Sequence, residues 1–247
     1  LRARLLVQNG ATPPPPDSPT PNSPAPSPPT PASPASAPTP DPKRDARPDG
    51  TRTAENVALE DEISPELDDA VRRGLAYLVT EQGDDGAFGS GRFGKNVAVT
   101  ALAGIALLAD GNVPGRGEYA KNVEKALEFI LSTSTETGLL AADSTNGPMY
   151  GHGFATLFLG EVYGMTQGGG ETRLSARTHE ALVKAVQLIE RSQNNEGGWR
   201  YNPVPFDADV SVTICQIMAL RSARNAGIDV PKETIDRAVE YVRQCQN

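Results

Sequence analysis

The sequence is poor in the residues that usually mark metal centres and disulfide frameworks. Its 247 residues include two histidines and two cysteines, and Cys215 and Cys245 do not fit a metal-binding spacing. We expect two thiols packed in or near a core, with a disulfide as the alternative if the protein is exported. No apolar run of about eighteen residues occurs, so the sequence predicts no transmembrane segment.

Basic residues are also in deficit. Lys and Arg number 23 against 31 Asp and Glu, which gives a formal net charge of −8. A surplus of negative charge repels phosphate groups, so it argues against nucleic acid or an anionic membrane as the main partner.

Proline is plentiful, but it is concentrated near the beginning of the chain. Sixteen of the 22 prolines lie between Pro13 and Pro48, mixed with Ser, Thr and Ala. Such a segment buries too little apolar area to offset its chain entropy. We therefore predict a disordered, polyproline-II-leaning spacer over residues 1–60 and one folded domain over residues 61–247.

The cellular location is left open by the sequence. The first residues, LRARLLVQNG, contain too short an apolar stretch for a signal peptide, and the chain does not begin with Met. We expect a missing upstream segment. A Pro/Ser/Thr spacer behind a lost export signal is one interpretation, which would fit a secreted or cell-envelope protein.

The folded part contains an internal repeat. Four amphipathic stretches end in apolar pairs spaced 52, 59 and 53 residues apart, namely Tyr77-Leu78, Phe129-Ile130, Leu188-Ile189 and Tyr241-Val242. Four residues beyond each pair come Gln82, Ser134, Gln193 and Gln246. The first three copies continue through a glycine-containing turn to a large apolar residue, which is Phe88, Leu140 or Trp199. Repeats of this length indicate a stack of supersecondary units.

Each turn is followed by a second helical pattern that is small or apolar on nearly every face. These stretches are NVAVTALAGIALLAD, YGHGFATLFLGEVYG and DVSVTICQIMALRSARNAG. They predict buried inner helices behind amphipathic outer helices. The unit is thus a helical hairpin, in which the glutamine bonds exposed backbone groups and the ring folds back over it. The predicted fold is all-α.

Three local signals refine this interpretation. Ser64 and Pro65 predict the start of the first outer helix, and Pro231 with Glu233 predicts the start of the fourth. The segment TQGGGETR, residues 166–173, looks like a tolerated insertion that lengthens the second period. GSGRFGKN, residues 89–96, matches a phosphate loop only in its letters, because it follows a turn rather than a strand.

The residues Gln193…Gly197-Gly198-Trp199 and Gln82…Gly86-Ala87-Phe88 resemble the Gln-Trp repeat of the prenyltransferase and squalene–hopene cyclase (terpenoid cyclase) superfamily. The resemblance covers residues 65–247. It implies an α/α-toroid, in which two concentric rings of helices enclose an apolar cavity for isoprenoid chains. A complete toroid takes about six hairpins, and this chain supplies about three and a half. We therefore expect the toroid to be partial and truncated at its C-terminus.

Squalene cyclases that this protein resembles protonate an alkene with an Asp of an Asp-x-Asp-Asp-Thr motif. The matching place reads FDADVSVT, where Asp207 and Asp209 have the first spacing but Val210 replaces the next Asp. Alignment on Thr213 leaves Asp209 alone. Asp207 and Asp209 are therefore candidate catalytic acids, and the alternative is that one of them caps the inner helix.

His152 is the third candidate. It is expected to open the second inner helix, in the place that Asp209 holds in the third and Asn96 in the first, so that the three would share one mouth of the cavity. The alternative is a buried structural histidine. The zinc set of protein prenyltransferases, an Asp and a Cys followed by a His, is not matched, since His152 precedes Asp209 and Cys215. No cofactor or metal is predicted.

Three functional classes remain open. The resemblance implies a terpene cyclase-like enzyme, although its acid motif is incomplete. A non-catalytic toroid could bind an isoprenoid or another apolar small molecule between residues 99–107, 155–159 and 213–218. A repeat scaffold could instead bind a partner protein on its surface.

Overall fold

The fold is known from a computed structural model, which describes residues 64–142, 147–167 and 172–246. All of them belong to one compact unit, Val57–Asn247. Within these ranges the chain forms seven α-helices, one 3₁₀ turn and two isolated bridges, with no β-strand. The prediction of an all-α fold is confirmed. The predicted spacer and the start of the chain lie outside the described residues.

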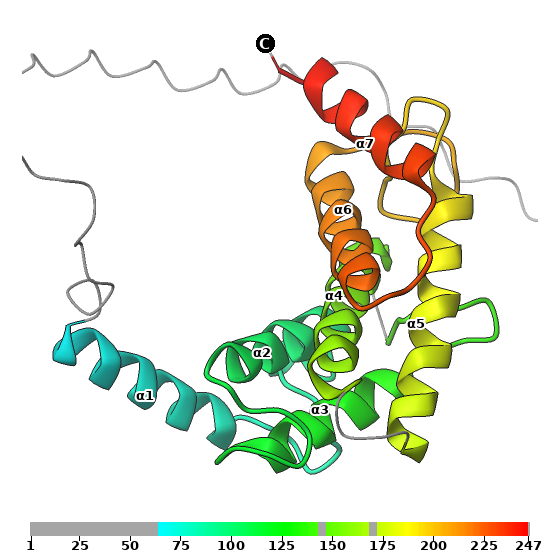
Figure 1. The fold of residues 1–247 in the computed structure, drawn as a ribbon. Coiled ribbons are helices and arrows are strands. Elements are labelled where there is room, and N and C mark those ends of the chain that lie inside the picture. Colours follow the sequence, from blue (N-terminus) through cyan, green and yellow to red (C-terminus); the bar gives the residue numbers. More distant parts are fainter. Residues whose placement is uncertain (1–63, 143–146, 168–171, 247) are drawn as a thin grey trace, which may run out of the picture. The chain divides into compact units, whose positions relative to one another are not determined.

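The helices form two sets that alternate along the chain (Figure 1). The outer helices are α1 (Pro65–Thr80), α3 (Ala120–Ser132), α5 (Arg173–Ser192) and α7 (Lys232–Gln244). The inner helices are α2 (Val97–Ala109), α4 (Met149–Thr166) and α6 (Val210–Asn225). Each outer helix has its apolar residues on one face, whereas the inner helices bury residues on several faces, as the sequence pattern predicts.

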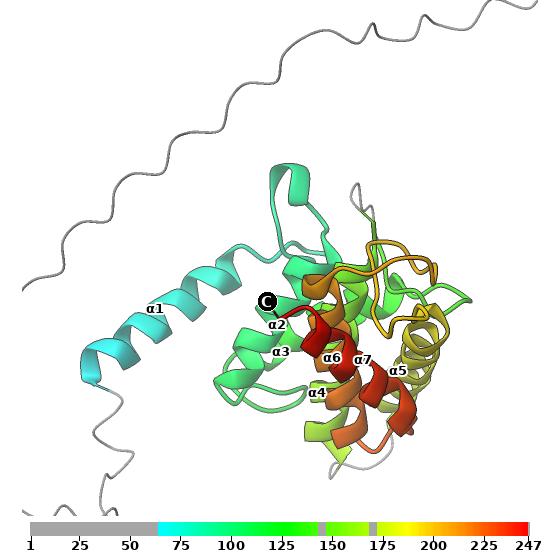
Figure 2. The same ribbon diagram turned by 90° about the horizontal axis from the view of Figure 1, so that it is seen from above.

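The inner helices pack side by side and run parallel, with α4 between α2 and α6 (Figures 1 and 2). At their N-terminal ends Gly151 of α4 faces Val97 of α2, and further along Phe158 of α4 packs on Gly104 of α2. Between α4 and α6, Gly160 touches Ser222 so closely that a Cβ would collide with it. Glycines therefore let the helix backbones approach, and the N-termini of all three inner helices lie at one end.

The predicted helix starts are confirmed. The Ser64 hydroxyl accepts a hydrogen bond from the Leu67 amide at 3.2 Å, and Pro65 occupies the first turn of α1. Pro231 precedes α7, whose first turn carries Glu233. The residues that resemble a phosphate loop form a turn and the 3₁₀ segment η2 (Gly91–Phe93) before α2, as expected for a loop between helices.

The first three outer helices are each joined to the following inner helix by the same kind of turn. Gly86, Gly138 and Gly197 all have positive φ values, of 85°, 83° and 96°. Each lies against the backbone of the next outer helix, at Lys125, Lys184 and Arg237 respectively, where a Cβ would meet a carbonyl oxygen. Glycine is required there for its conformation and for its lack of a side chain.

The contacts predicted for the glutamine and the ring are confirmed at the third turn, where Gln193 and Trp199 form what we call the clip. The Gln193 amide donates to the carbonyls of Gly197 and Thr234, both at 2.9 Å, and so ties the turn to α7. Trp199 is 1% exposed, and its indole Nε1 donates to the Ile189 carbonyl at 2.7 Å. This carbonyl lies in the last turn of α5, where the helix supplies no backbone donor for it, and it also accepts from the Ser192 hydroxyl at 3.1 Å.

The two cysteines differ in their surroundings. Cys215 is buried between α6 and α4, which raises the pKa of its thiol through desolvation. Cys245 is exposed, so the expectation of packing in or near a core is wrong for this residue. Both thiols are free, and the alternative of a disulfide is not observed. None of the helices in the described ranges is long and apolar enough to cross a membrane.

Candidate functional site

The three inner helices begin at one end of the layer, and their N-caps are Asn96, Pro148 and Asp209. The Asn96 side chain accepts a hydrogen bond from the Val99 amide, and the Asp209 carboxylate accepts from the Ser211 and Val212 amides. Both polar side chains therefore cap helices, which is the structural alternative that the sequence left open for Asp209. Pro148 has no such group.

A pocket of about 620 Å³ opens at this end, beside the N-termini of α2 and α4. We call it the mouth pocket. Its lining is mainly aliphatic and aromatic, with three polar side chains, and it consists of Arg92, Phe93, Asn96, Val97, Ala98, Val99, Leu140, Ala141, Ala142, Gly147, Pro148, Tyr150 and Gly151. The volume lies within the range of small-molecule sites, and a few polar groups in an apolar wall are typical of them.

The polar side chains of the mouth pocket come from different elements. Arg92 belongs to η2, and its guanidinium carbon lies 4.7 Å from the ring centre of Phe93. Tyr150 is in the first turn of α4, and its hydroxyl lies 2.5 Å from the Ser211 hydroxyl of α6. The pocket thus offers a cation, a phenol and the Asn96 amide around an apolar floor.

Tyr150 connects the mouth pocket to a polar cluster at the start of α6. The Ser211 hydroxyl donates to Asp209 at 2.5 Å, and the Tyr201 hydroxyl approaches the other carboxylate oxygen at 3.4 Å. These hydrogen bonds, led by that of Ser211, lower the pKa of the Asp209 carboxyl. Asp209 therefore carries its negative charge at neutral pH.

Asp207 has a different partner. Its carboxylate forms an ion pair with Arg200 at 2.9 Å, and the Arg200 guanidinium also lies over the Tyr201 ring. Asp207 and Asp209 thus point to separate hydrogen-bonding partners and do not share a proton between them. The described structure does not bring them together as a carboxylate pair.

His152 lies elsewhere than expected. It is the fourth residue of α4 and fully buried, and its place corresponds to Thr100 of α2 and Thr213 of α6 rather than to the N-caps. Its Nδ1 accepts from the Leu140 amide at 3.2 Å, as the hydroxyls of Thr100 and Thr213 accept from Phe88 and Trp199. The expectation that His152 opens the helix beside Asn96 and Asp209 is wrong.

The surroundings of His152 keep its ring neutral. Burial lowers its pKa from 6.5 to about 4, and nearby Arg191 acts in the same direction. Since Nδ1 accepts a hydrogen bond, the proton of the neutral ring is on Nε2, which donates to the Ala185 carbonyl of α5 at 3.2 Å. His152 faces the outer helix and not the mouth pocket, which fits the structural alternative.

The opposite side of the inner layer carries an apolar face. Leu102 lies two residues after Thr100 in α2, and Phe154 lies two residues after His152 in α4, so both point away from the outer helices. Leu102 is 46% exposed and Met218 of α6 is 48% exposed, whereas Phe154 and Leu157 are half-buried. We call these four residues the inner face. Leu102, Leu157 and Met218 fall in the ranges predicted to line an apolar interior.

Ile214, another exposed apolar residue of α6, lies outside the inner face. It occupies the place that Gly153 has in α4, and Gly153 packs against Cys215 of the next inner helix. Ile214 therefore lies on the edge by which one inner helix packs on another. We assign it no role in ligand binding.

The sequence predicted part of this site. Asn96 and Asp209 share one end, as expected, but Arg92, Tyr150, Tyr201 and Ser211 were not singled out. Tyr150 and Ser211 are the second residues of α4 and α6, and they belong to no motif shared between the repeats. Their contact depends on the parallel packing of the two helices, which the sequence does not reveal. Among the described side chains, no group of three or more His, Cys, Asp and Glu residues could hold a metal ion.

No protein-family model matches this chain, and a search of curated proteins finds no significant match either.

Proposed function

We propose that this protein binds an apolar small molecule with a polar head, of the isoprenoid class, in the mouth pocket and along the inner face. The observation that carries the proposal is the 620 Å³ mouth pocket, where Arg92, Asn96 and Tyr150 surround an otherwise apolar wall. An alcohol or anionic head would hydrogen-bond to these three side chains, while the chain would lie on aliphatic groups.

The inner face supports a long ligand rather than a compact one. Leu102 and Met218 are each about half exposed, and a ligand that covered them would gain about 1 kcal/mol per side chain. The resemblance to Gln-Trp repeat proteins agrees with this assignment, and it extends the proposal to the arrangement of the hairpins as part of an α/α-toroid.

The chemistry of the site favours a protein that binds the ligand over an enzyme that protonates it. An acid that protonates an alkene needs surroundings that keep its carboxyl group neutral. Hydrogen bonds from Ser211 and the α6 amides favour the carboxylate of Asp209 instead, and Asp207 is paired with Arg200. These contacts disfavour both residues as the acid of a cyclase. A cyclase is the alternative function, and it is implied by the resemblance alone.

Calorimetric titration with farnesol tests the binding proposal. Gly151 lines the mouth pocket, and a Cβ there would make an ordinary contact with Val97 at 3.7 Å. Gly151→Leu should fill the pocket and weaken binding by about tenfold, which corresponds to about 1.4 kcal/mol. Gly164→Leu is the matched control, because Gly164 is in the same helix and its Cβ would meet Ala226 at 3.5 Å.

The two variants should keep the fold, since leucine favours a helix more than glycine does. Equal affinity of both variants and the wild type, or no saturable binding of farnesol to the wild type, would overturn the proposal. Asp209→Asn addresses the enzyme alternative, because Asn is as good an N-cap as Asp. Turnover of an isoprenoid that is present in the wild type and absent in Asp209→Asn would identify an enzyme instead.

A further inference from the structure

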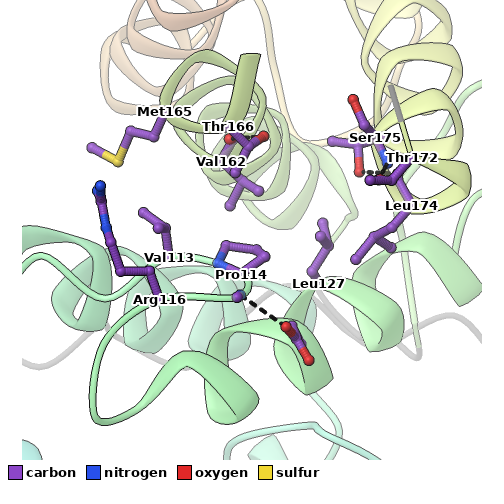
Figure 3. A pocket seen from close by; sticks show the side chains of 13 residues that line it. Val113, Pro114, Arg116, Leu127, Val162, Met165, Thr166, Thr172, Leu174 and Ser175 are labelled. Atoms are coloured by element: carbon purple, nitrogen blue, oxygen red, sulfur yellow. Dashed lines mark hydrogen bonds between the residues drawn. The ribbon is translucent and has the colours of Figure 1, made fainter. Parts of the chain in front are cut away.

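A second large pocket lies at the other end of the inner layer, beyond the C-terminal half of α4. Its volume is about 650 Å³. Figure 3 shows it between the loop that carries Val113 and Pro114, the helix α3 with Leu127, and the opposite helices α4 and α5. We call it the insertion pocket. It shares no residue with the mouth pocket, so its role is independent of the function proposed above.

The name refers to an irregularity of the repeat. The outer helix α5 has 20 residues, whereas α3 and α7 have 13 each. Lys184 of α5 matches Lys125 of α3 and Arg237 of α7 at the turn contacts, so most of the additional residues lie at the N-terminal end of α5. Three of these residues, Leu174, Ser175 and Thr178, line the pocket. The additional residues of α5 therefore supply one wall of a cavity that is large enough for a small molecule.

The floor of the insertion pocket is aliphatic. Leu127 and Val162 are 1% and 2% exposed, and Val113 is also buried. Leu174 and Met165 close the two sides (Figure 3). A floor of buried aliphatic side chains favours an apolar ligand body.

The polar groups around this floor have unused hydrogen-bonding capacity of both kinds. The hydroxyls of Thr166 and Thr178 donate to carbonyls of their own helices, which leaves their lone pairs as acceptors. The Thr172 hydroxyl accepts from the Ser175 amide, and no acceptor for its proton is observed among the described residues. A ligand hydroxyl, which both donates and accepts, can satisfy groups of both kinds.

The charges at the pocket balance. Arg116 and Glu124 are the charged residues among the described lining, one of each sign. Glu124 accepts a hydrogen bond from the Gly115 amide at 2.9 Å. Arg116 extends along the side of the pocket toward Met165 (Figure 3). A charged ligand would meet one favourable and one unfavourable partner and would lose its hydration, so an uncharged ligand is favoured.

From this geometry we propose that the insertion pocket binds a small, uncharged, mainly aliphatic alcohol. The aliphatic body lies on Leu127 and Val162, and the hydroxyl group lies among Thr166, Thr172 and Ser175. The pocket is thus a second binding site, and the additional residues of α5 form one of its walls.

Three probes that share a cyclohexane ring test the ligand class, namely cyclohexanol, cyclohexanecarboxylate and cyclohexylammonium. Binding is followed by the methyl NMR signals of the full chain. Cyclohexanol should shift the signals of Leu127, Val162 and Leu174 with a dissociation constant of about 1–10 mM. The two charged probes should bind at least about fivefold more weakly, because burial in the pocket costs them hydration.

Ser175→Trp should fill the pocket and abolish these shifts, and Ala176→Trp is the control, since Ala176 is exposed on the same helix and does not line the pocket. The signals of Val99 and Leu140 report separately on the mouth pocket, so failure of one site is distinguishable from failure of the other. Equal or tighter binding of either charged probe, no saturable shift with cyclohexanol, or unchanged binding in Ser175→Trp would each overturn the proposal.

Discussion

The second and third turns of the repeat have the same backbone and different side chains. Both are closed by a hydrogen bond across the turn, from the Thr135 amide to the Leu139 carbonyl and from the Asn194 amide to the Gly198 carbonyl, each at 3.0 Å. In the third turn Gln193 ties the turn to the next outer helix. In the second turn Ser134 is too short to do so, and a space of about 160 Å³ lies beside it.

The large apolar residue shows a similar difference. Trp199 and Leu140 are both buried, but only the indole of Trp199 can donate to the preceding outer helix. The acceptor for the backbone amide differs too, being Thr213 in one case and His152 in the other. The comparison teaches that the hydrogen-bond scheme of the turn is retained, while the residues that satisfy it vary.

The largest expected effect is at the tryptophan. Trp199→Ala should lower the free energy of unfolding by about 3–5 kcal/mol, because it leaves a cavity and removes the donor to the Ile189 carbonyl. Denaturant unfolding measures it. Leu140→Ala should cost less, about 2–3 kcal/mol, because the smaller side chain has no hydrogen bond to lose. A loss below about 1 kcal/mol for Trp199→Ala would contradict the clip.

The turn glycines should tolerate little change. Gly138→Ala should lower the free energy of unfolding by about 2–4 kcal/mol, since a Cβ would meet the Lys184 carbonyl and the positive φ is strained for alanine. Gly111→Ala is the control, because Gly111 has φ 86° with no atom within 4 Å of its Cβ. It should cost only about 1 kcal/mol. Equal losses would show that conformation alone matters.

The histidine of the second turn should make stability depend on pH. The folded-state pKa of about 4 is below the unfolded value of 6.5, so the stabilising contribution is complete above pH 6.5 and is lost as the pH falls toward 4. Between pH 7 and 4.5 this loss amounts to about 2 kcal/mol. His152→Thr restores the residue type of Thr100 and Thr213 and should remove that part of the slope.

The difference between wild type and His152→Thr isolates the histidine, because the carboxyl groups contribute equally to both. The variant should also be less stable by a constant amount at every pH, since threonine fills less of the buried space. Parallel stability curves over pH 7 to 4.5 would show that the ring does not titrate as its burial indicates.

The smallest expected effect is a gain. Ser134→Gln should place an amide in the 160 Å³ space lined by Ala181 and Lys184, where it can bond the turn to α5 as Gln193 bonds the third turn to α7. We expect the free energy of unfolding to rise by about 0.5–1.5 kcal/mol. A decrease, measured by denaturant unfolding, would show that the space cannot accept the longer side chain.

The amino-acid sequence by itself determined the helical hairpins and their joints. Apolar periodicity separates the outer from the inner helices, and the spacing of Gln193 and Trp199 marks the turn, because these features follow from contacts within or next to one hairpin. The sequence also offered helix capping as one of two roles for Asp209, because an N-cap is a local feature. In the structure Asp209 caps α6. His152 was misplaced by four residues, since Pro148 gives no polar signal for the start of α4.

Only the tertiary structure decided where the two pockets lie. The mouth pocket combines Arg92 of η2 with Tyr150 of α4, and Tyr150 meets Ser211 only because glycines let α4 and α6 pack closely in parallel. The N-terminal extension of α5 has no apolar pattern that reveals a cavity. Its effect depends on where the additional turns of α5 fall relative to Leu127 and Val162, which lie far away in the sequence. Such contacts depend on how the hairpins pack on one another, and they cannot be predicted from the helix propensity or apolar periodicity of a single segment.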